Sequence, residues 1–532
     1  MDPRLQRLID HSEIRETIEA YVHACDRGDR DATADVYHPD SWDDHGPVKC
    51  AGPEFADRNT EALMTRWIGA VAGVALAWAA AIVFAGPSVY PTGTTIYDPA
   101  RTWNGYTVLS PFGTQAAIVI DMNGNIVKQW DGYVSSAGGP ARVFPGGVIV
   151  GAAGANPPRQ ESLELVQRDF DGKVLWRFDH NEQIETRDGQ TKEAQTKEAK
   201  TIWALRQHHD WQRADFPAGY YSPEATPGTA GSNTLVLTHT NRIQPKVAPN
   251  AMLEDDRIIE VSWERKIVWE WVASDHNDDF HFNQDARKAI ASAPGVNAGR
   301  GAGRGAFDWM HINSATYVGP NRWYDQGDQR FAPNNVIISS RQASFLAIIA
   351  RDGSVVWQLG PDFSVSPELR AIRQIIGQHH AHFIPKGLPG AGNVMIFDNG
   401  GPSGYGTPSP IALDGQNIYA RPTSRVLEID PVTLKLVWSY TSPTFFATNI
   451  SGAQRLPNGN TIVTEGPSGR LFEVTKEGTI IWEYVFPIFT AGARPTNSVY
   501  RAYRLPYGWI PQLARPKEEA VTPPAAGKFR VP

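Results

Sequence analysis

GTIIW, at residues 478–482, is the last of six short stretches that decide the fold of this chain. Each stretch joins a turn residue, a few mostly apolar residues and a tryptophan. The first and last intervals between these tryptophans are each about 45 residues, a period typical of propeller blades. The residues before each tryptophan read as a four-stranded meander. The sequence therefore predicts an all-β fold, a six-bladed β-propeller. The other five stretches are GNIVKQW ending at Trp130, GKVLW at Trp176, RKIVW at Trp269, GSVVW at Trp357 and LKLVW at Trp438.

Three histidine runs fall at the same position of these repeats. The turn LPNG at 456–459 and the turn FIPKG at 383–387 each follow the first strand of a repeat. Aligning them places His379 level with Ser451, and the HIN run from His311 and the HHD run from His208 take the same position. Inner strands of a propeller line its axial channel. These histidines are therefore expected to converge, although they are far apart in the sequence.

Composition agrees with a large all-β body and excludes some partners. The chain has 532 residues, with 48 Gly and 40 Pro, which suits many turns. Its net charge of -7 gives no reason to expect a nucleic-acid partner. The two cysteines, Cys25 and Cys50, precede the propeller, so the propeller has no disulfide and no thiol chemistry.

An uncharged run, WIGAVAGVALAWAAAIVFA at 67–85, is long enough to cross a bilayer as a helix. Arg66 precedes it and the next charge after it is Asp98, so the C-terminal side is expected to be exported. Val83 and Ala85 form a small-residue cleavage site, and Met64 is a possible start. The helix at 64–86 is thus either a transmembrane anchor or a cleaved signal. Either way, the sequence predicts an extracytoplasmic propeller at 90–510.

The two ends of the chain differ from the propeller. Residues 1–57 have apolar side chains at helical spacing from Ile14 to Cys25, which predicts a short amphipathic helix. The run YVHACDRGDRDATADVYHPDSWDDHGP at 21–47 resembles the opening of SnoaL-like proteins of the nuclear-transport-factor-2-like superfamily. The match stops near Phe55, so it implies a truncated domain. The tail at 511–532 is predicted to be disordered.

Seven runs of the propeller resemble the bacterial arylsulfotransferase family, in order along the chain. That family implies a six-bladed propeller that moves a sulfuryl group from a phenolic sulfate ester to a phenol. It implies a sulfated histidine intermediate and no nucleotide sulfate donor, no cofactor and no metal. The runs are TIYDPARTWNGYTVLSPFG at 95–113, HHDWQ at 208–212, WMHINSATY at 309–317, IISSRQASFLAII at 337–349, GQHHAHFIP at 377–385, FDNGG at 397–401 and NSVYRAYRLPY at 497–507.

Site residues follow from this resemblance, run by run. The QH-x-A histidine, the expected nucleophile, is His379, and His380 is the substitute candidate. The HIN run contributes His311 and Asn313, and the SSR run contributes Arg341.

The HHD run offers His208 or His209 as a further channel residue. His208 is favoured because its neighbour would point away from the channel in a regular strand. The candidate catalytic residues are therefore His379, His311, His208 and Arg341, and the candidate substrate-binding residues are Asn313, His209 and His380.

The chemistry needs these residue types independently of the family. A neutral imidazole is a good nucleophile near pH 7, and its attack on sulfur divides one hard transfer into two easier steps. A guanidinium offers paired donors to the sulfuryl oxygens. Two other readings stay open. HHAH at 379–382 could bind zinc or copper with a histidine from another blade, or the propeller could bind ligands without catalysis.

Overall fold

The computed structural model describes residues 42–44, 49–51, 92–134, 139–155, 160–186, 200–292, 306–491 and 495–522. Residues 1–82 and 83–532 form two separate units. In the first, the described residues form two paired antiparallel strands, β1 (Trp42–Asp44) and β2 (Lys49–Ala51). The predicted amphipathic helix and the apolar segment at 64–86 lie outside the described residues, and the SnoaL-like resemblance stays a prediction. No helix in the described ranges is long and apolar enough to cross a membrane.

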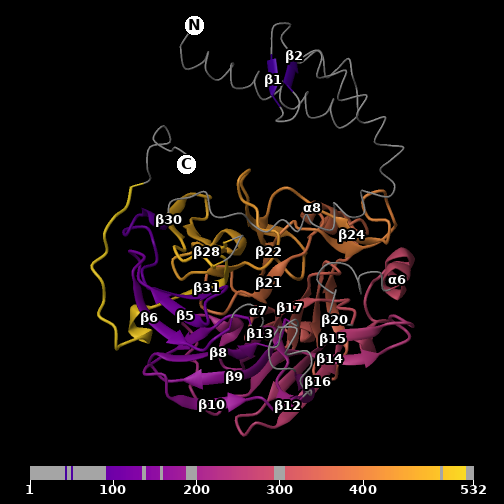
Figure 1. The fold of residues 1–532 in the computed structure, drawn as a ribbon, viewed down its shortest axis with the longest axis horizontal. Coiled ribbons are helices and arrows are strands. Elements are labelled where there is room, and N and C mark those ends of the chain that lie inside the picture. Colours follow the sequence, from indigo (N-terminus) through magenta and orange to yellow (C-terminus); the bar gives the residue numbers. More distant parts are fainter. Residues whose placement is uncertain are drawn as a thin grey trace. The chain divides into compact units, whose positions relative to one another are not determined.

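The second unit is an all-β propeller built from antiparallel meanders, as the tryptophan repeat predicts (Figure 1). Four of its sheets are separate blades. Their strand orders are β31 (Val499–Leu505), β4 (Tyr106–Pro111), β5 (Ala116–Ile120) and β6 (Ile126–Asp131); β17 (Ile312–Tyr317), β18 (Val336–Ser340), β19 (Phe345–Ile349) and β20 (Val355–Leu359); β21 (His379–Phe383), β22 (Val394–Asp398), β25 (Arg425–Ile429) and β26 (Leu436–Tyr440); and β27 (Gly452–Arg455), β28 (Thr461–Glu465), β29 (Arg470–Val474), β30 (Ile480–Val485) and β3 (Gly93–Tyr97).

The remaining two meanders join into one eight-stranded sheet, so the predicted count of six separate blades is corrected to four within the described residues. One backbone pairing, Gln207 with Ser162, connects β13 of one meander to β9 of the other. The eight strands are β7 (Arg142–Phe144), β8 (Val148–Ala155), β9 (Ser162–Arg168), β10 (Val174–Phe178), β13 (Gln207–Arg213), β14 (Thr234–Ile243), β15 (Met252–Val261) and β16 (Ile267–Val272).

The six tryptophans explain why the repeats stack. Each indole Nε1 donates a hydrogen bond of 2.8–3.1 Å to a carbonyl in the turn that precedes the next tryptophan strand. The last, Trp482, donates to the carbonyl of Met122, which lies before Trp130, so the ring of bonds closes. Trp482 is fully buried, whereas Trp269 and Trp438 are half-buried. The repeated tryptophans are therefore structural residues between neighbouring repeats.

Both ends of the propeller chain are tied into its sheets. β3 adds to the outer edge of β30, and β31 supplies the inner strand beside β4. Val521 exchanges two backbone hydrogen bonds with Tyr97, so residues up to 522 of the predicted disordered tail follow the propeller. The rest of that tail lies outside the described residues.

Neighbouring inner strands contact one another. β13 contacts β17, and β17 contacts β21, which brings the histidine runs together; β27 likewise contacts β31 (Figure 1).

The loops contain short helices and strand pairs. The loop elements are the strand pairs β11 (Glu182–Thr186) with β12 (Lys200–Ala204) and β23 (Ser403–Tyr405) with β24 (Gln416–Tyr419), the helices α6 (Gln284–Ala291), α7 (Arg322–Asp325) and α8 (Pro367–Ile372), and the short 3-10 helices η3 (Pro217–Gly219), η4 (Ala273–His276), η7 (Gln329–Phe331), η8 (Gly466–Ser468) and η9 (Tyr507–Trp509).

Candidate functional site

The inner strands begin with an irregular backbone that re-aims the histidines. The pairing of β13, β17 and β21 with their neighbours shifts register at this end. A left-handed φ falls on His209 (56°), His311 (46°), His380 (50°) and Ser451 (85°). Such values are uncommon outside glycine and cluster at functional sites. The shared conformation thus falls on His209 and His380, one residue after the positions that the turn alignment indicates.

His209, rather than His208, lies beside the histidine of the next inner strand. The ring centroids of His209 and His311 are 4.7 Å apart. His209 is half-buried, whereas His208 is completely buried behind it. The expected alternation of a regular strand fails here because the left-handed residue turns the chain. Burial, followed by the nearby His311 and His208, holds the pKa of His209 well below its usual value, so its imidazole is neutral.

Arg341 and His311 are joined through the backbone. The N–H of Arg341 donates to the carbonyl of His311 over 3.1 Å. The Nδ1 of His311 lies 2.6 Å from a carboxylate oxygen of Asp308, so Nδ1 carries the proton because a carboxylate only accepts.

Burial lowers the pKa of His379 well below its usual value, and Arg341 adds to the shift. Arg341 therefore acts electrostatically on a histidine from another blade.

His379 has a tautomer set by its neighbours. The N–H of Ile450 donates to its Nε2 over 3.2 Å, and Asn399 Oδ1 lies 2.8 Å from its Nδ1. Nε2 therefore holds the lone pair and Nδ1 holds the proton. This side chain is 2% exposed. His379 is thus a buried, neutral imidazole whose acceptor nitrogen is covered by one long hydrogen bond.

The other histidines of the HHAH run are also engaged. His380 accepts a bond from the N–H of Ala453 at Nδ1, and its Nε2 lies 3.4 Å from the hydroxyl of Tyr503. The hydroxyl of Tyr220 lies 3.0 Å from Nε2 of His382, whose Nδ1 faces the carbonyl of His380. A metal needs lone pairs that are free and convergent. The lone pairs of HHAH accept protein hydrogen bonds instead, so the run does not fit the zinc or copper reading.

Asn313 connects two inner strands. Its side chain is completely buried, and its Nδ2 donates to the carbonyl of Gln378 over 2.6 Å. The backbone carbonyl of Asn313 accepts a bond of 2.8 Å from Arg501. These contacts hold β17 against β21 and β31. Asn313 thus connects inner strands, its Oδ1 has no hydrogen-bond partner among the described residues, and its role in substrate binding stays a prediction.

Sequence reasoning missed a buried ionic centre. Asp210 lies 2.8 Å from a guanidinium nitrogen of Arg142 and 3.3 Å from one of Arg501. All three side chains are at most 1% exposed. Asp210 belongs to the HHD run and Arg501 to the NSVYRAYRLPY run, so both residues lie in runs that carry the family resemblance. Their pairing across nearly 300 residues carries no local signal.

A further buried cluster, behind the histidine pair, was also missed. His208 stacks on His239 with ring centroids 3.6 Å apart, and both lie near Asp256. His239 stands alone in the strand LTHTN, and a lone strand histidine gives no indication of a network. Its carboxylate partners Glu161 and Glu254 come from two other strands or loops of the sheet.

Comparison with known proteins gives one family. The family described as "Arylsulfotransferase (ASST)" matches residues 226–487. No curated protein matches the chain. Similar solved structures include a protein of unknown function from Bacteroides caccae (10% identity, 75% of this chain and 98% of that chain, TM-score 0.38) and a streptogramin B lyase (12%, 78% and 93%, 0.33). Another is virginiamycin B lyase from Staphylococcus aureus (10%, 76% and 86%, 0.33).

All three TM-scores are low, so these structural likenesses carry no argument. The family match begins after His208 and His209 and includes the other candidate site residues. It supports assigning the part of the chain that carries His311, Arg341 and His379 to the arylsulfotransferase family.

Proposed function

We propose that this propeller transfers a sulfuryl group from an aryl sulfate to a phenol through a sulfated histidine, without a nucleotide donor. The observation that carries the proposal is the convergence of His209, His311 and His379 from three inner strands near Arg341. The family match independently supports aryl sulfate sulfotransferase activity. Donor and acceptor are then small phenolic compounds.

Arg341 supplies the positive charge that an aryl sulfate needs. Its guanidinium offers paired N–H donors to the sulfuryl oxygens, which keep their negative charge throughout the transfer. Arg341 is half-buried, so water is partly excluded from its guanidinium. Charge interactions are stronger in such surroundings than in bulk water, so this residue contributes to transition-state stabilisation.

His379 is the proposed nucleophile because its tautomer is correct for attack. Its Nε2 lone pair forms the nitrogen–sulfur bond while the sulfur–oxygen bond to the leaving phenol breaks. The N–H of Ile450 must first release this nitrogen, at a cost of about 1 kcal/mol, the net worth of an ordinary hydrogen bond. In the second step the acceptor phenol loses its proton and attacks sulfur, and His379 is regenerated. His311, paired with Asp308, is placed to hold a proton in these steps.

The test uses the full chain and a chromogenic aryl sulfate, with and without added phenol. We expect release of the chromophore to depend on the phenol and to form the new sulfate ester. His379→Ala should reduce transfer by about 10,000-fold or more, because removal of a nucleophile leaves only binding and charge stabilisation. His180→Ala, which changes an exposed histidine, is the matched control.

Two results would redirect or end this proposal. Transfer that survives in His379→Ala would move the nucleophile to His380 or another histidine. No release from folded protein over a panel of aryl sulfates would refute sulfuryl transfer. Without acceptor, peptide mapping after a neutral quench should find the sulfuryl group on the peptide that contains His379.

We also propose that the propeller works outside the cytoplasm. The support is the uncharged run at 67–85 and the absence of charge between it and Asp98. Cell fractionation with protease protection tests this location, and a protected propeller inside intact cells would contradict it.

A further inference from the structure

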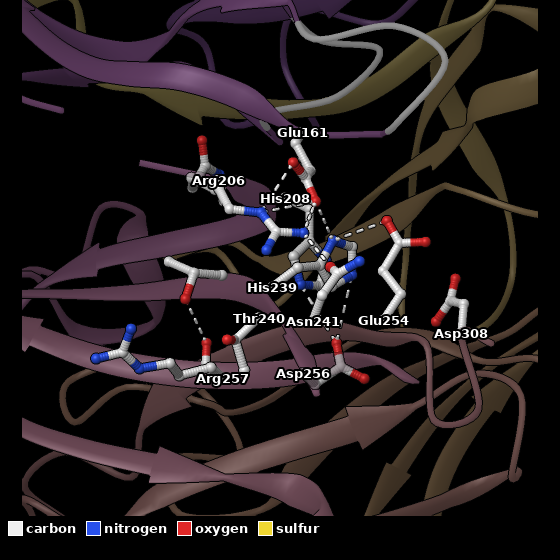
Figure 2. A network of polar contacts seen from close by, with 12 residues as sticks. Glu161, Arg206, His208, His239, Thr240, Asn241, Glu254, Asp256, Arg257 and Asp308 are labelled. Atoms are coloured by element: carbon white, nitrogen blue, oxygen red, sulfur yellow. Dashed lines mark hydrogen bonds and ion pairs between the residues drawn. The ribbon is translucent and has the colours of Figure 1, made fainter. Parts of the chain in front are cut away.

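A buried network of hydrogen bonds and ion pairs surrounds His208 (Figure 2), whose Nδ1 contacts His209. His208 and His239 stack at an interplanar angle of 13°, between Glu161 on one side and Asp256 on the other. These four side chains are at most 2% exposed. Burying charged groups is costly unless nearby groups of opposite charge compensate, so the charges of this cluster must balance within it. Their proton positions can therefore be deduced from their partners.

The positions of the protons on the side chains that connect Asp256 to His209 can be deduced from three contacts. Asp256 Oδ2 accepts a bond of 3.1 Å from the N–H of Ile312, which fixes the carboxylate. Its Oδ1 lies 3.2 Å from Nε2 of His208, an ion-pair distance at which the negative carboxylate favours a proton on that nitrogen. Nδ1 of His208 lies 2.8 Å from Nδ1 of His209, so one of these nitrogens donates and the other accepts.

His208 is neutral, which decides the direction of that last bond. Burial, followed by the neighbouring His239, lowers the pKa of His208 to about 4. A neutral His208 with a proton on Nε2 has its lone pair on Nδ1. His209 must then donate through Nδ1, and its Nε2 carries the lone pair. Within the described residues, Nε2 of His209 has no hydrogen-bond partner.

His239 is the positive member of the stack. Burial alone would lower its pKa, but Glu254, Glu161 and Asp256 together raise it to about 9. Its Nδ1 lies 3.2 Å from an oxygen of Glu161 and 3.5 Å from one of Glu254. The charged ring disfavours a second charge on His208, against which it stacks. His239 thus keeps the relay from Asp256 to His209 in its neutral state.

The same residues do not fit a metal site. Ligand imidazoles must aim their lone pairs at one point, in the plane of each ring. The rings of His208 and His239 are nearly parallel, with centroids 3.6 Å apart, so their in-plane lone pairs do not converge. Arg206 also lies 2.6 Å from Glu161 and already neutralises that carboxylate. A proton relay accounts for the arrangement, and a cation does not.

We infer that Asp256 and His208 are positioning residues that hold His209 with an unprotonated Nε2 toward the channel, and that His209 is the base for the acceptor phenol. This inference rests on the proposed sulfuryl transfer. The phenol O–H gives its proton to Nε2 as its oxygen bonds to sulfur and the nitrogen–sulfur bond of the sulfohistidine breaks. His209 becomes cationic, and the line to Asp256 stabilises that charge. The proton passes to the phenolate released from the next donor.

The decisive variant is Asp256→Asn, which keeps the shape of the side chain and removes its charge. An amide can donate to His208, so it permits the opposite tautomer in both histidines. Transfer to the phenol should slow by about 100- to 10,000-fold, as expected when an acid–base group loses its orientation, while kcat/KM for the donor is unchanged. Formation of the sulfohistidine without acceptor should persist.

Asp255→Asn is the matched control. Asp255 is the preceding residue of β15, is completely buried, and binds the indole of Trp309 over 2.9 Å rather than a histidine. Equal loss of transfer in both variants, after correction for the folded fraction, would overturn the inference.

A spectroscopic measurement needs no activity at all. Nitrogen-15 NMR of the histidines in the unmodified chain should show His209 with Nδ1 protonated and Nε2 unprotonated, with assignment by His209→Gln. Asp256→Asn should shift the tautomer, and Asp255→Asn should not. A protonated Nε2 in the unmodified chain would overturn the inference. A failure of sulfuryl transfer alone would refute the proposed function while the NMR result still decides the tautomer.

Discussion

Replacing Asp210 by asparagine should destabilise the propeller more than any exposed ionic substitution. The carboxylate joins Arg142 of β7 and Arg501 of β31 to its own strand β13, and none of the three side chains reaches solvent appreciably. Asparagine keeps the volume, but it leaves two buried guanidinium groups without their anion. Breaking a buried pair by removing one charge costs about 3–5 kcal/mol. We expect a loss of that size in the free energy of unfolding.

Urea unfolding of the full chain, followed by tryptophan fluorescence, measures this loss from the midpoint and the slope. Asp328→Asn is the control, since Asp328 forms an exposed pair with Arg330 at 2.7 Å and such pairs contribute about 0–1 kcal/mol. Asparagine can still cap the short helix at that position. If Asp210→Asn destabilises no more than the control, then Asp210 does not hold the inner strands together, and the reasoning from burial and charge is wrong.

Two further predictions concern charge in the channel. Arg341→Lys should lower kcat/KM for the aryl sulfate by about 10- to 100-fold, because lysine keeps the charge and loses the paired donors; steady-state kinetics with unchanged kcat/KM would contradict this. Acid should destabilise the fold between pH 6.5 and about 4. Burial lowers the pKa of His208 to about 4, and burial with Arg341 lowers that of His379, so these two histidines bind more protons in the unfolded chain than in the folded chain in this window. Urea midpoints at pH 7, 5.5 and 4.5 test the prediction, and constant midpoints would refute it.

The repeat pattern predicted more of the fold than of the site. Trp482 and its equivalents predicted the propeller because an apolar residue repeated at blade spacing identifies one structural unit per repeat. The position of His209 was harder to predict. Alternation of side chains along a strand assumes a regular backbone, and a residue with a left-handed φ breaks that assumption. Asp210 and Arg501 pair only in three dimensions. The bridge between Gln207 and Ser162 likewise has no counterpart in sequence periodicity.

The partner of each imidazole indicates its role better than its position in a run does. Protonation is favoured when a carboxylate faces a ring nitrogen, as Glu161 and Glu254 do for His239. His379 faces only an amide oxygen and backbone groups, and the nearby arginine opposes protonation.

An imidazole that must attack sulfur needs a lone pair at all working pH values, whereas an imidazole that moves protons must be able to accept one. Neutral partners suit the first task and carboxylates suit the second. His209 reaches a carboxylate only through His208, so its basicity can respond to the anionic sulfuryl group that arrives in the channel. In the proposed mechanism, the nucleophile and the proton carriers therefore differ in the groups that lie behind each ring, and the tautomer measurement on His209 tests this difference.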